Sequence, residues 1–184
     1  MGYAVANGNL PCPAISATNG LEDRVAGTGL CNAFKRDGFI PWATLGVSKL
    51  DAWGNIFRYS VTPAYAYTAP QPLFALNTLR ILTVQTRIAG ALSPLTNVND
   101  IPAVVLSHGK NGYGSVDDQG HPQAPVPVSN VDEISNWTVN TLTFFSRVPQ
   151  APGLPGIGGE FDDIVVWVSP NILFNRMVAA GKLP

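Results

Sequence analysis

Hydrophobic and polar residues alternate in several short segments of this chain, and the first clear case is residues 56–61 (IFRYSV). Phe57, Tyr59 and Val61 fall on one side of this segment, opposite Ile56, Arg58 and Ser60, which is the pattern of a β-strand. Four further segments share β-branched and apolar residues and are also predicted as strands: 79–90, 101–109, 140–148 and 161–169. The segment 101–109 is nearly all apolar, so we expect it to be central. Together these segments predict a mostly antiparallel sheet of four to five strands.

The hydrophobic period changes after the last predicted strand. Leu173, Met177 and Ala180 recur at helical spacing and would form one apolar stripe. Ser169 is a favourable N-cap residue, and Pro170 suits the first helical position. The pattern therefore predicts a short C-terminal helix over residues 170–181.

The first eight residues (MGYAVANG) resemble the last turn of a helix. Asn7 and Gly8 supply the left-handed residues that commonly end one, and Pro11 and Pro13 prevent a restart nearby. Two interpretations follow: residues 1–8 are either a frayed stub or the end of a longer helix that has been cut away upstream.

The segments between these elements are rich in turn-forming residues. We expect a single domain over residues 1–184, with 9–48 as an irregular loop, 49–169 as the sheet region and 109–131 as a long exposed loop within it. A second loop, residues 149–160, precedes the last strand. The predicted fold class is α+β.

Cys12 and Cys31 are the two cysteines of the chain. The segment between them is polar and rich in glycine, with little core of its own, so a disulfide would stabilise it by about 3 kcal/mol. An even number of cysteines in a chain with few charges fits an oxidising compartment. We favour a Cys12–Cys31 disulfide over the alternative of two buried free thiols.

The charge content argues against a nucleic-acid partner. The net charge is −1, 12% of residues are charged, and no run of like charges occurs. In these 184 residues no stretch reaches the roughly 20 apolar residues that a membrane span needs.

Enzyme motifs are weak throughout. Residues 156–161 (GIGGEF) begin like a dinucleotide-binding fingerprint, but Phe161 stands at its last glycine position. Of the two histidines, His121 lies in a predicted loop, and His108 is interpreted as a strand-end residue that bonds to backbone. We therefore predict no catalytic residues and no enzymatic activity.

One group of oxygen-bearing residues is a stronger candidate for a site than these motifs. If the strands at 101–109 and 161–169 pair, Ser107 and Asn111 come close to Asp162 and Asp163. Hard oxygen ligands of this kind suit calcium. The alternative is that the acids only cap and solvate the strand entrance, and the residues alone favour that alternative.

Three motifs, in order, resemble those of type IV pilins and type II secretion pseudopilins. They are LDAWGNIFRYSV at 50–61, VVLSHGKNGYG at 104–114 and FDDIVVW at 161–167. The major-pseudopilin pattern is D-P-W-G-N-P-Y-x-Y, then a strand ending in S-x-G-x-D-G, then D-D-I. The opening residues GYAVANGNLPCPA also resemble the junction that follows the long N-terminal helix in prepilin-like proteins.

The resemblance implies a periplasmic pilin-like head, packed on the end of an N-terminal helix whose anchor half has been removed. Such proteins sit in the inner membrane before assembly and then join a filament with other pilin or pseudopilin subunits. The long loops favour a minor subunit of a pilus or secretion filament. The resemblance also implies a calcium site on Asp162 and Asp163, although a long insertion separates these residues from the glycine-rich turn.

Two other functions stay open. A secreted or periplasmic binding module could stack a sugar or peptide on Trp137, Tyr65 and Tyr67. A hydrolase could use Asp162 or Asp163. Exposed aromatic residues would favour the binding module, and we expect three tryptophans to be buried instead: Trp42, Trp53 and Trp167.

Overall fold

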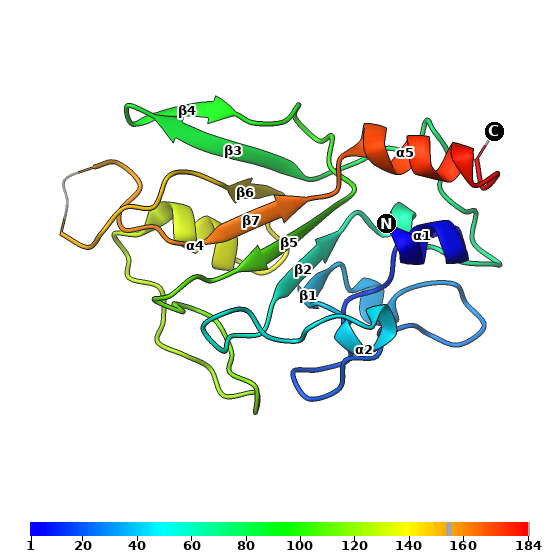
Figure 1. The fold of residues 1–184 in the computed structure, drawn as a ribbon, viewed down its shortest axis with the longest axis horizontal. Helices are drawn as coiled ribbons and strands as arrows, with labels where there is room; N and C mark the ends of the chain where they lie inside the picture. Colours follow the sequence, from blue (N-terminus) through cyan, green and yellow to red (C-terminus); the bar gives the residue numbers. More distant parts are fainter. Residues whose placement is uncertain (154–155, 184) are drawn as a thin grey trace.

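Two open sheets make up the β structure of the computed structural model, which describes residues 1–153 and 156–183. The first sheet is antiparallel throughout, in the order β1 (Asp37–Phe39), β2 (Arg58–Val61), β5 (Ala103–Ser107) and β7 (Ile164–Trp167). The second has the order β4 (Ala91–Pro94), β3 (Thr83–Ile88) and β6 (Thr143–Phe145), in which β3 and β6 run parallel. Figure 1 shows the two sheets side by side.

Helices lie at both ends of the described chain and between the strands. α1 (Gly2–Asn7) ends at Gly8, which has a left-handed φ of 81°. α5 (Pro170–Ala179) lies beside α1, and Figure 1 shows the two helices next to each other. The remaining helical elements are short: a 3₁₀ turn at Asn32–Phe34, α2 (Trp42–Leu45), α3 (Pro63–Ala66) and α4 (Val131–Trp137).

The apolar core has two parts, on opposite faces of the first sheet. Tyr59 and Val61 of β2 and Ala103 of β5 share one face and pack in a cluster with Ala4 of α1 and Met177 of α5. The second part lies on the other face, between the two sheets, and contains Leu82, Val84, Ile101, Val104, Leu106, Phe144 and Val165. The first sheet is therefore covered by α1 and α5 at one end of one face, and by α4 and the second sheet on the other.

The predicted disulfide between Cys12 and Cys31 is present, with the two Cα atoms 5.5 Å apart. Both residues belong to the core beneath α1 and α5. The disulfide therefore fastens the irregular N-terminal segment to the same core that holds the two terminal helices.

The α+β class is confirmed, and the predicted single sheet is wrong. All five predicted strand segments contain a strand, but 79–90 and 140–148 pair with each other in a separate sheet, and β1 and β4 were not predicted. The helix α4 begins at Val131, the last residue of the segment 109–131 that was expected to be a loop. Residues 154 and 155 of the second predicted loop lie outside the described residues. Among the helices of the described residues, none combines the length and the apolar composition of a membrane span.

Candidate functional site

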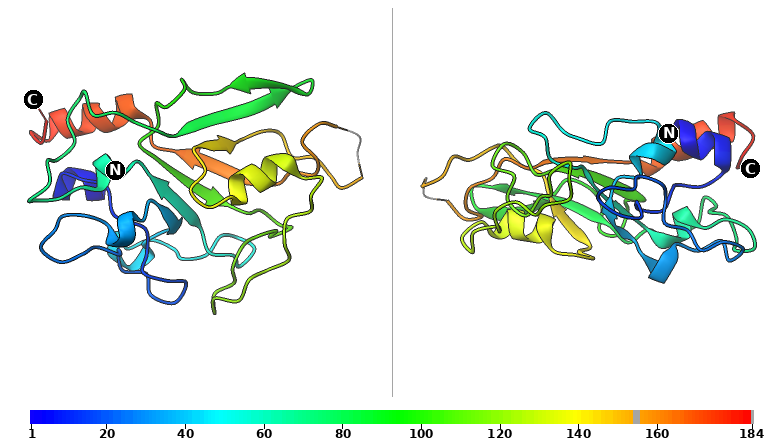
Figure 2. Two further views of the ribbon diagram at one scale, coloured as in Figure 1. Left: turned by 180° about the vertical axis from the view of Figure 1, so that it is seen from behind. Right: turned by 90° about the horizontal axis from the view of Figure 1, so that it is seen from below.

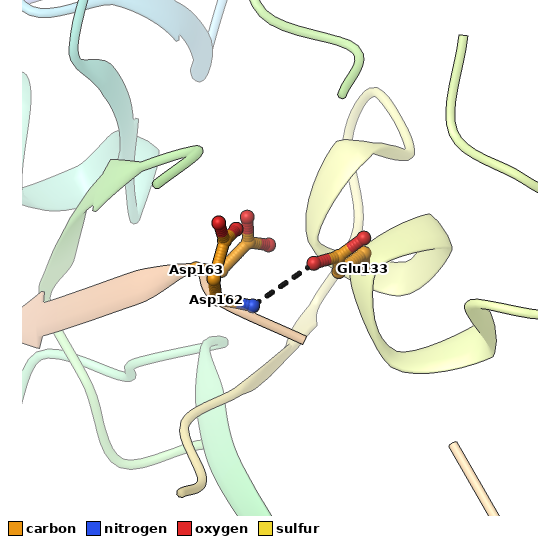
Figure 3. Close-up of side chains that lie close together, drawn as sticks. All are labelled: Glu133, Asp162 and Asp163. Carbon is orange, nitrogen blue, oxygen red and sulfur yellow. Dashed lines mark hydrogen bonds between the residues drawn. The ribbon is translucent and has the colours of Figure 1, made fainter. Parts of the chain in front are cut away.

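Three carboxylates meet where α4 approaches the start of β7. Glu133 comes from α4, while Asp162 and Asp163 immediately precede β7, and one oxygen from each lies within 4.8 Å of the others. Figure 3 shows Glu133 facing the two aspartates. Glu133 and Asp163 are buried, with 1% and 6% of their surface exposed, and Asp162 is partly exposed. We call these three residues the acidic centre.

The pairing of β5 with β7 positions the two aspartates. Ser107 pairs with Ile164 at the end of the ladder, so the chain beyond it places His108 and Gly109 opposite the aspartates. Gly109 has a φ of 62°, and a Cβ there would overlap the carbonyl oxygen and Oδ1 of Asp162. Only glycine allows this close approach between the turn and the acidic centre.

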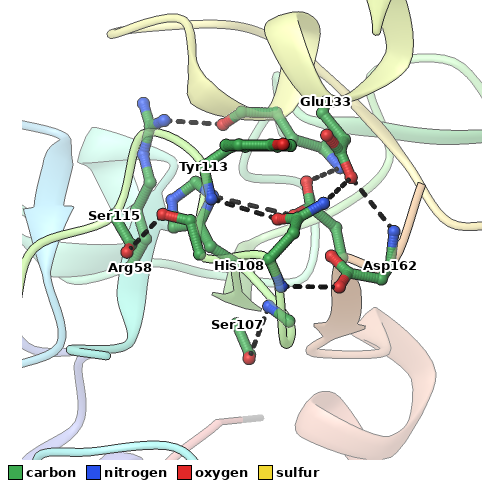
Figure 4. A network of polar contacts seen from close by, with 12 residues as sticks. Arg58, Ser107, His108, Tyr113, Ser115, Glu133 and Asp162 are labelled. Atoms are coloured by element: carbon green, nitrogen blue, oxygen red, sulfur yellow. Dashed lines mark hydrogen bonds and ion pairs between the residues drawn. The ribbon is translucent and has the colours of Figure 1, made fainter. Parts of the chain in front are cut away.

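Backbone and amide donors hold Glu133 and Asp162 in place (Figure 4). The Asn111 backbone NH donates to Asp162 Oδ2 at 2.8 Å, and its side-chain amide donates to Glu133 Oε1 at 3.0 Å. The same Oε1 accepts the backbone NH of Asp162 at 3.0 Å, and Oε2 accepts the Asn130 amide at 2.9 Å. These bonds fix the carboxylates without neutralising their charge.

The third carboxylate is held in a similar way. Asn136 of α4 donates its amide to Asp163 Oδ2 at 2.8 Å and to the carbonyl oxygen of Phe145 at 3.0 Å. The other oxygen, Asp163 Oδ1, lies 3.7 Å from Nδ1 of His108. His108 is 3% exposed. Among the described residues, neither its Nδ1 nor Asp162 Oδ1 has a hydrogen-bond partner.

Two of the three carboxyl groups of the acidic centre have raised pKa values. Burial raises the pKa of Glu133 and of Asp162, and repulsion from the Asp163 carboxylate raises both further. Hydrogen bonds from Asn111 lower the pKa of both groups and offset part of this effect. A positive charge placed among the three carboxylates would favour their ionised forms.

The predicted calcium ligands separate into two groups. Asp162 and Asp163 belong to the acidic centre, and Asn111 lies at its edge as a hydrogen-bond donor. Ser107 lies apart, because its hydroxyl donates to Asp51 Oδ2 at 2.6 Å and accepts the backbone NH of Gly109. Sequence reasoning missed Glu133, which follows the long predicted loop.

The oxygen ligands of the acidic centre suit calcium, whereas the nearby imidazole nitrogen does not. The sequence predicts that His108 is a strand-end residue that forms hydrogen bonds with the backbone. Its carbonyl oxygen does accept the backbone NH of Gly112, but its ring nitrogen Nδ1 faces Asp163.

A second feature lies on the face of the first sheet opposite α4. Ile164 and Val166 of β7 are 49% and 60% exposed, whereas Val165, which points to the other face, is 6% exposed. Together with Trp53, Phe57 and Val105, the two exposed residues line a groove of about 320 Å³ with almost entirely apolar walls. We call these five residues the open sheet face.

The N-terminal end of α1 lies beside this face. In all three views of Figures 1 and 2, the N-terminus is at the end of α1 nearer the strands, and in the right-hand view of Figure 2 α1 and α4 lie on opposite sides of the first sheet. The helices cover Tyr59 and Val61 and leave Val105 only partly covered. The open sheet face is thus the continuation of a surface that α1 and α5 already cover.

The aromatic residues of the alternative binding function do not form one surface. Tyr65 is fully buried and stacks on Phe74 with ring centroids 4.7 Å apart. Trp137 is 44% exposed and borders a pocket of about 170 Å³. Trp53, expected to be buried, is 46% exposed and belongs to the open sheet face, and Trp42 and Trp167 are partly buried.

No family model matches the sequence, and no curated protein or solved structure is significantly similar to it.

Proposed function

We propose that this chain is the head domain of a pilin-like structural subunit, which acts by assembly into a filament. The observation that carries the proposal is the open sheet face next to the N-terminal end of α1. An apolar surface continuous with a helix-covered core is typical of a surface that another segment covers.

The proposed occupant is a helix that continues α1 upstream of Met1. Such a helix advances about 1.5 Å per residue, so a few turns would extend from α1 along Val105 and Val166. Fully burying an exposed valine or isoleucine side chain is favourable by about 1.5–3 kcal/mol. Ile164 and Val166 are 49% and 60% exposed, so covering them would contribute about half of that free energy for each residue to the attachment of the helix.

Other observations are consistent with a filament subunit. The motifs at 50–61, 104–114 and 161–167 resemble those of pilins and pseudopilins, and two of them include residues of β5 and β7, which contribute Val105, Ile164 and Val166 to the open sheet face. The Cys12–Cys31 disulfide favours an oxidising compartment such as the periplasm. We propose that other pilin or pseudopilin subunits are its partners, and that the upstream helix sits in the inner membrane before assembly.

The gene sequence and a filament assay test this proposal. We expect the reading frame to encode a long apolar helix that runs into residues 1–8, preceded by a short basic leader. Expression of the full-length subunit in its host should yield it in the sheared surface fraction or in periplasmic filaments seen by electron microscopy. A reading frame with only a cleaved secretion signal ahead of residue 1 would contradict the proposal.

A further inference from the structure

We propose that His108, Glu133, Asp162 and Asp163 form a zinc site with one nitrogen and three oxygen ligands. This inference is independent of the filament proposal, since it concerns the opposite side of the first sheet and a different ligand. Zinc commonly binds histidine nitrogen together with aspartate or glutamate oxygen, and its structural sites take four ligands.

Two separations within this group suit one small ion: the one between His108 and Asp163, and those among the three carboxylates. Zinc bonds to nitrogen and oxygen measure about 2.0–2.2 Å, so one ion can contact two atoms up to roughly 4 Å apart. His108 Nδ1 and Asp163 Oδ1 are 3.7 Å apart, within this reach. The three carboxylate oxygens lie within 4.8 Å of one another, so small side-chain rotations would bring them into contact with the same ion. His108 lies outside this 4.8 Å group, so its ring would have to move toward Glu133 and Asp162 when the ion binds.

The hydrogen bonds leave one oxygen of each aspartate free to face the proposed ion. Asn111 fixes Asp162 Oδ2, and Asn136 fixes Asp163 Oδ2. The remaining atoms are Asp162 Oδ1, which has no partner among the described residues, and Asp163 Oδ1, which faces His108. Donors that hold the second oxygen of a ligating carboxylate are the usual outer shell of a metal site.

His108 is the independent observation that points to a ligand. Its side chain is 4% exposed, and its Nδ1 has no hydrogen-bond partner among the described residues although it lies 3.7 Å from Asp163 Oδ1. A buried polar atom normally finds a partner in protein, water or an ion. A zinc ion would give both Nδ1 of His108 and Oδ1 of Asp162 a partner at the same time.

The donor set distinguishes zinc from the calcium that the pilin resemblance implies. Calcium takes six to eight oxygen ligands, whereas this centre offers three carboxylates and an imidazole. Imidazole favours zinc and other first-row transition metals. An open depression of about 560 Å³, bordered by Asn111, Glu160 and Asp162, gives an ion a route from solvent.

Metal titration of the chain tests the site. After treatment with a chelator and its removal, we expect one equivalent of Zn²⁺ to bind and to raise the melting temperature more than millimolar Ca²⁺ does. Co²⁺ used as a visible probe should give the absorption bands of a four-coordinate site. The His108→Asn variant should weaken Zn²⁺ binding at least about 100-fold and change the Co²⁺ spectrum, since the amide replaces nitrogen with oxygen.

His121→Asn is the matched control. His121 contacts Asp117 at 3.1 Å, but its side chain is 75% exposed, so the same substitution there should leave Zn²⁺ binding unchanged. Circular dichroism checks whether His108→Asn folds. If it does not, Asp162→Asn takes its place, since Asp162 is only partly buried. This variant should lose the same Zn²⁺ affinity. The proposal is overturned if Zn²⁺ does not bind at one equivalent, if the folded variant binds it as tightly as the original chain, or if Ca²⁺ stabilises the chain more.

Discussion

Gly109 lies so close to Asp162 that no side chain fits between them. A Cβ at residue 109 would overlap both the carbonyl oxygen and Oδ1 of Asp162. The contact follows from the β5–β7 register, which brings the turn after β5 against the start of β7. The backbone of one strand end therefore holds a ligand of the proposed zinc site in place.

Gly109→Ala should destabilise the chain more than Gly54→Ala. Both glycines have positive φ, and alanine in that region costs about 1–2 kcal/mol. At residue 54 an added Cβ would have no atom within 4 Å. At residue 109 the added Cβ would also overlap Asp162, which should lower the free energy of unfolding by a further amount of about 1–3 kcal/mol. Urea unfolding followed by circular dichroism measures the difference, and equal losses for the two variants would contradict the close approach.

Arg58 connects the first sheet to the end of α4. Its Nε donates to Asp37 Oδ1 at 2.9 Å, and its guanidinium donates to the carbonyl oxygens of Asn136 at 2.6 Å and Thr138 at 2.9 Å. The Asp37 side chain is 1% exposed, so it would be left as an unpaired buried charge without Arg58.

Arg58→Met should therefore lower the free energy of unfolding by about 3–5 kcal/mol. Adding Asp37→Asn should recover part of this loss, because the second substitution removes the buried charge. Arg176→Met, at an exposed position on α5, is the control and should change stability by less than about 0.5 kcal/mol. A loss at residue 58 as small as that of the control would show that the ion pair contributes little.

Tyr3 should make the chain less stable at alkaline pH. Burial, the nearby Glu22 charge and the hydrogen bond from the Tyr3 hydroxyl to Glu22 raise the pKa of Tyr3 from 10.0 to about 12. Because the folded-state pKa is above the unfolded value, the unfolded chain releases this proton first. The free energy of unfolding contributed by Tyr3 should then decline as pH rises from 10 to about 12.

Phenolate absorbance and urea unfolding across this pH range check the prediction. Tyr3→Phe should remove the late-titrating phenol and make the decline in stability shallower. Burial also raises the pKa of Tyr59, so part of the decline in the free energy of unfolding with rising pH should persist in this variant. The prediction would be contradicted if the free energy of unfolding of Tyr3→Phe declined as steeply with rising pH as that of the original chain.

Loss of the disulfide should affect the N-terminal segment most. Replacing both Cys12 and Cys31 by alanine opens a loop with a sequence separation of 19 residues and should cost about 3 kcal/mol of stability. Urea unfolding of the double variant measures the loss, and hydrogen exchange should locate it within residues 9–48. A loss below about 1 kcal/mol would indicate that packing alone holds this segment.

The strands and the end helices could be predicted because their hydrophobic patterns are local. Residues 56–61, 101–109 and 161–169 all contain strands of the first sheet, and Gly8 ends α1 as expected. The division into two sheets could not be predicted in the same way. It depends on the parallel pairing of β3 with β6, two strands far apart in sequence, and no local pattern specifies such a partner.

The acidic centre was only partly predictable because α4 has an inverted pattern. Its buried residues are Asp132, Glu133 and Asn136, while Val131 and Trp137 are 45% and 44% exposed. A helix that buries polar residues gives no apolar stripe, so its sequence is typical of a loop. Asp162 and Asp163 were found because they precede a strong strand pattern, and Glu133 was missed for lack of one.

The most direct test of the filament-subunit account is the chemical accessibility of residue 166 in the presence and absence of upstream residues. Both native cysteines form the disulfide, so Val166→Cys introduces a single free thiol on the open sheet face. Val128→Cys, at a position that is 90% exposed, is the matched control. Maleimide labelling would compare residues 1–184 with the detergent-solubilised full-length monomer. We predict that the thiol at position 166 reacts at least about tenfold more slowly in the full-length monomer, while the control reacts equally in both. Equal reactivity at position 166 in the two chains would contradict an upstream helix on this face.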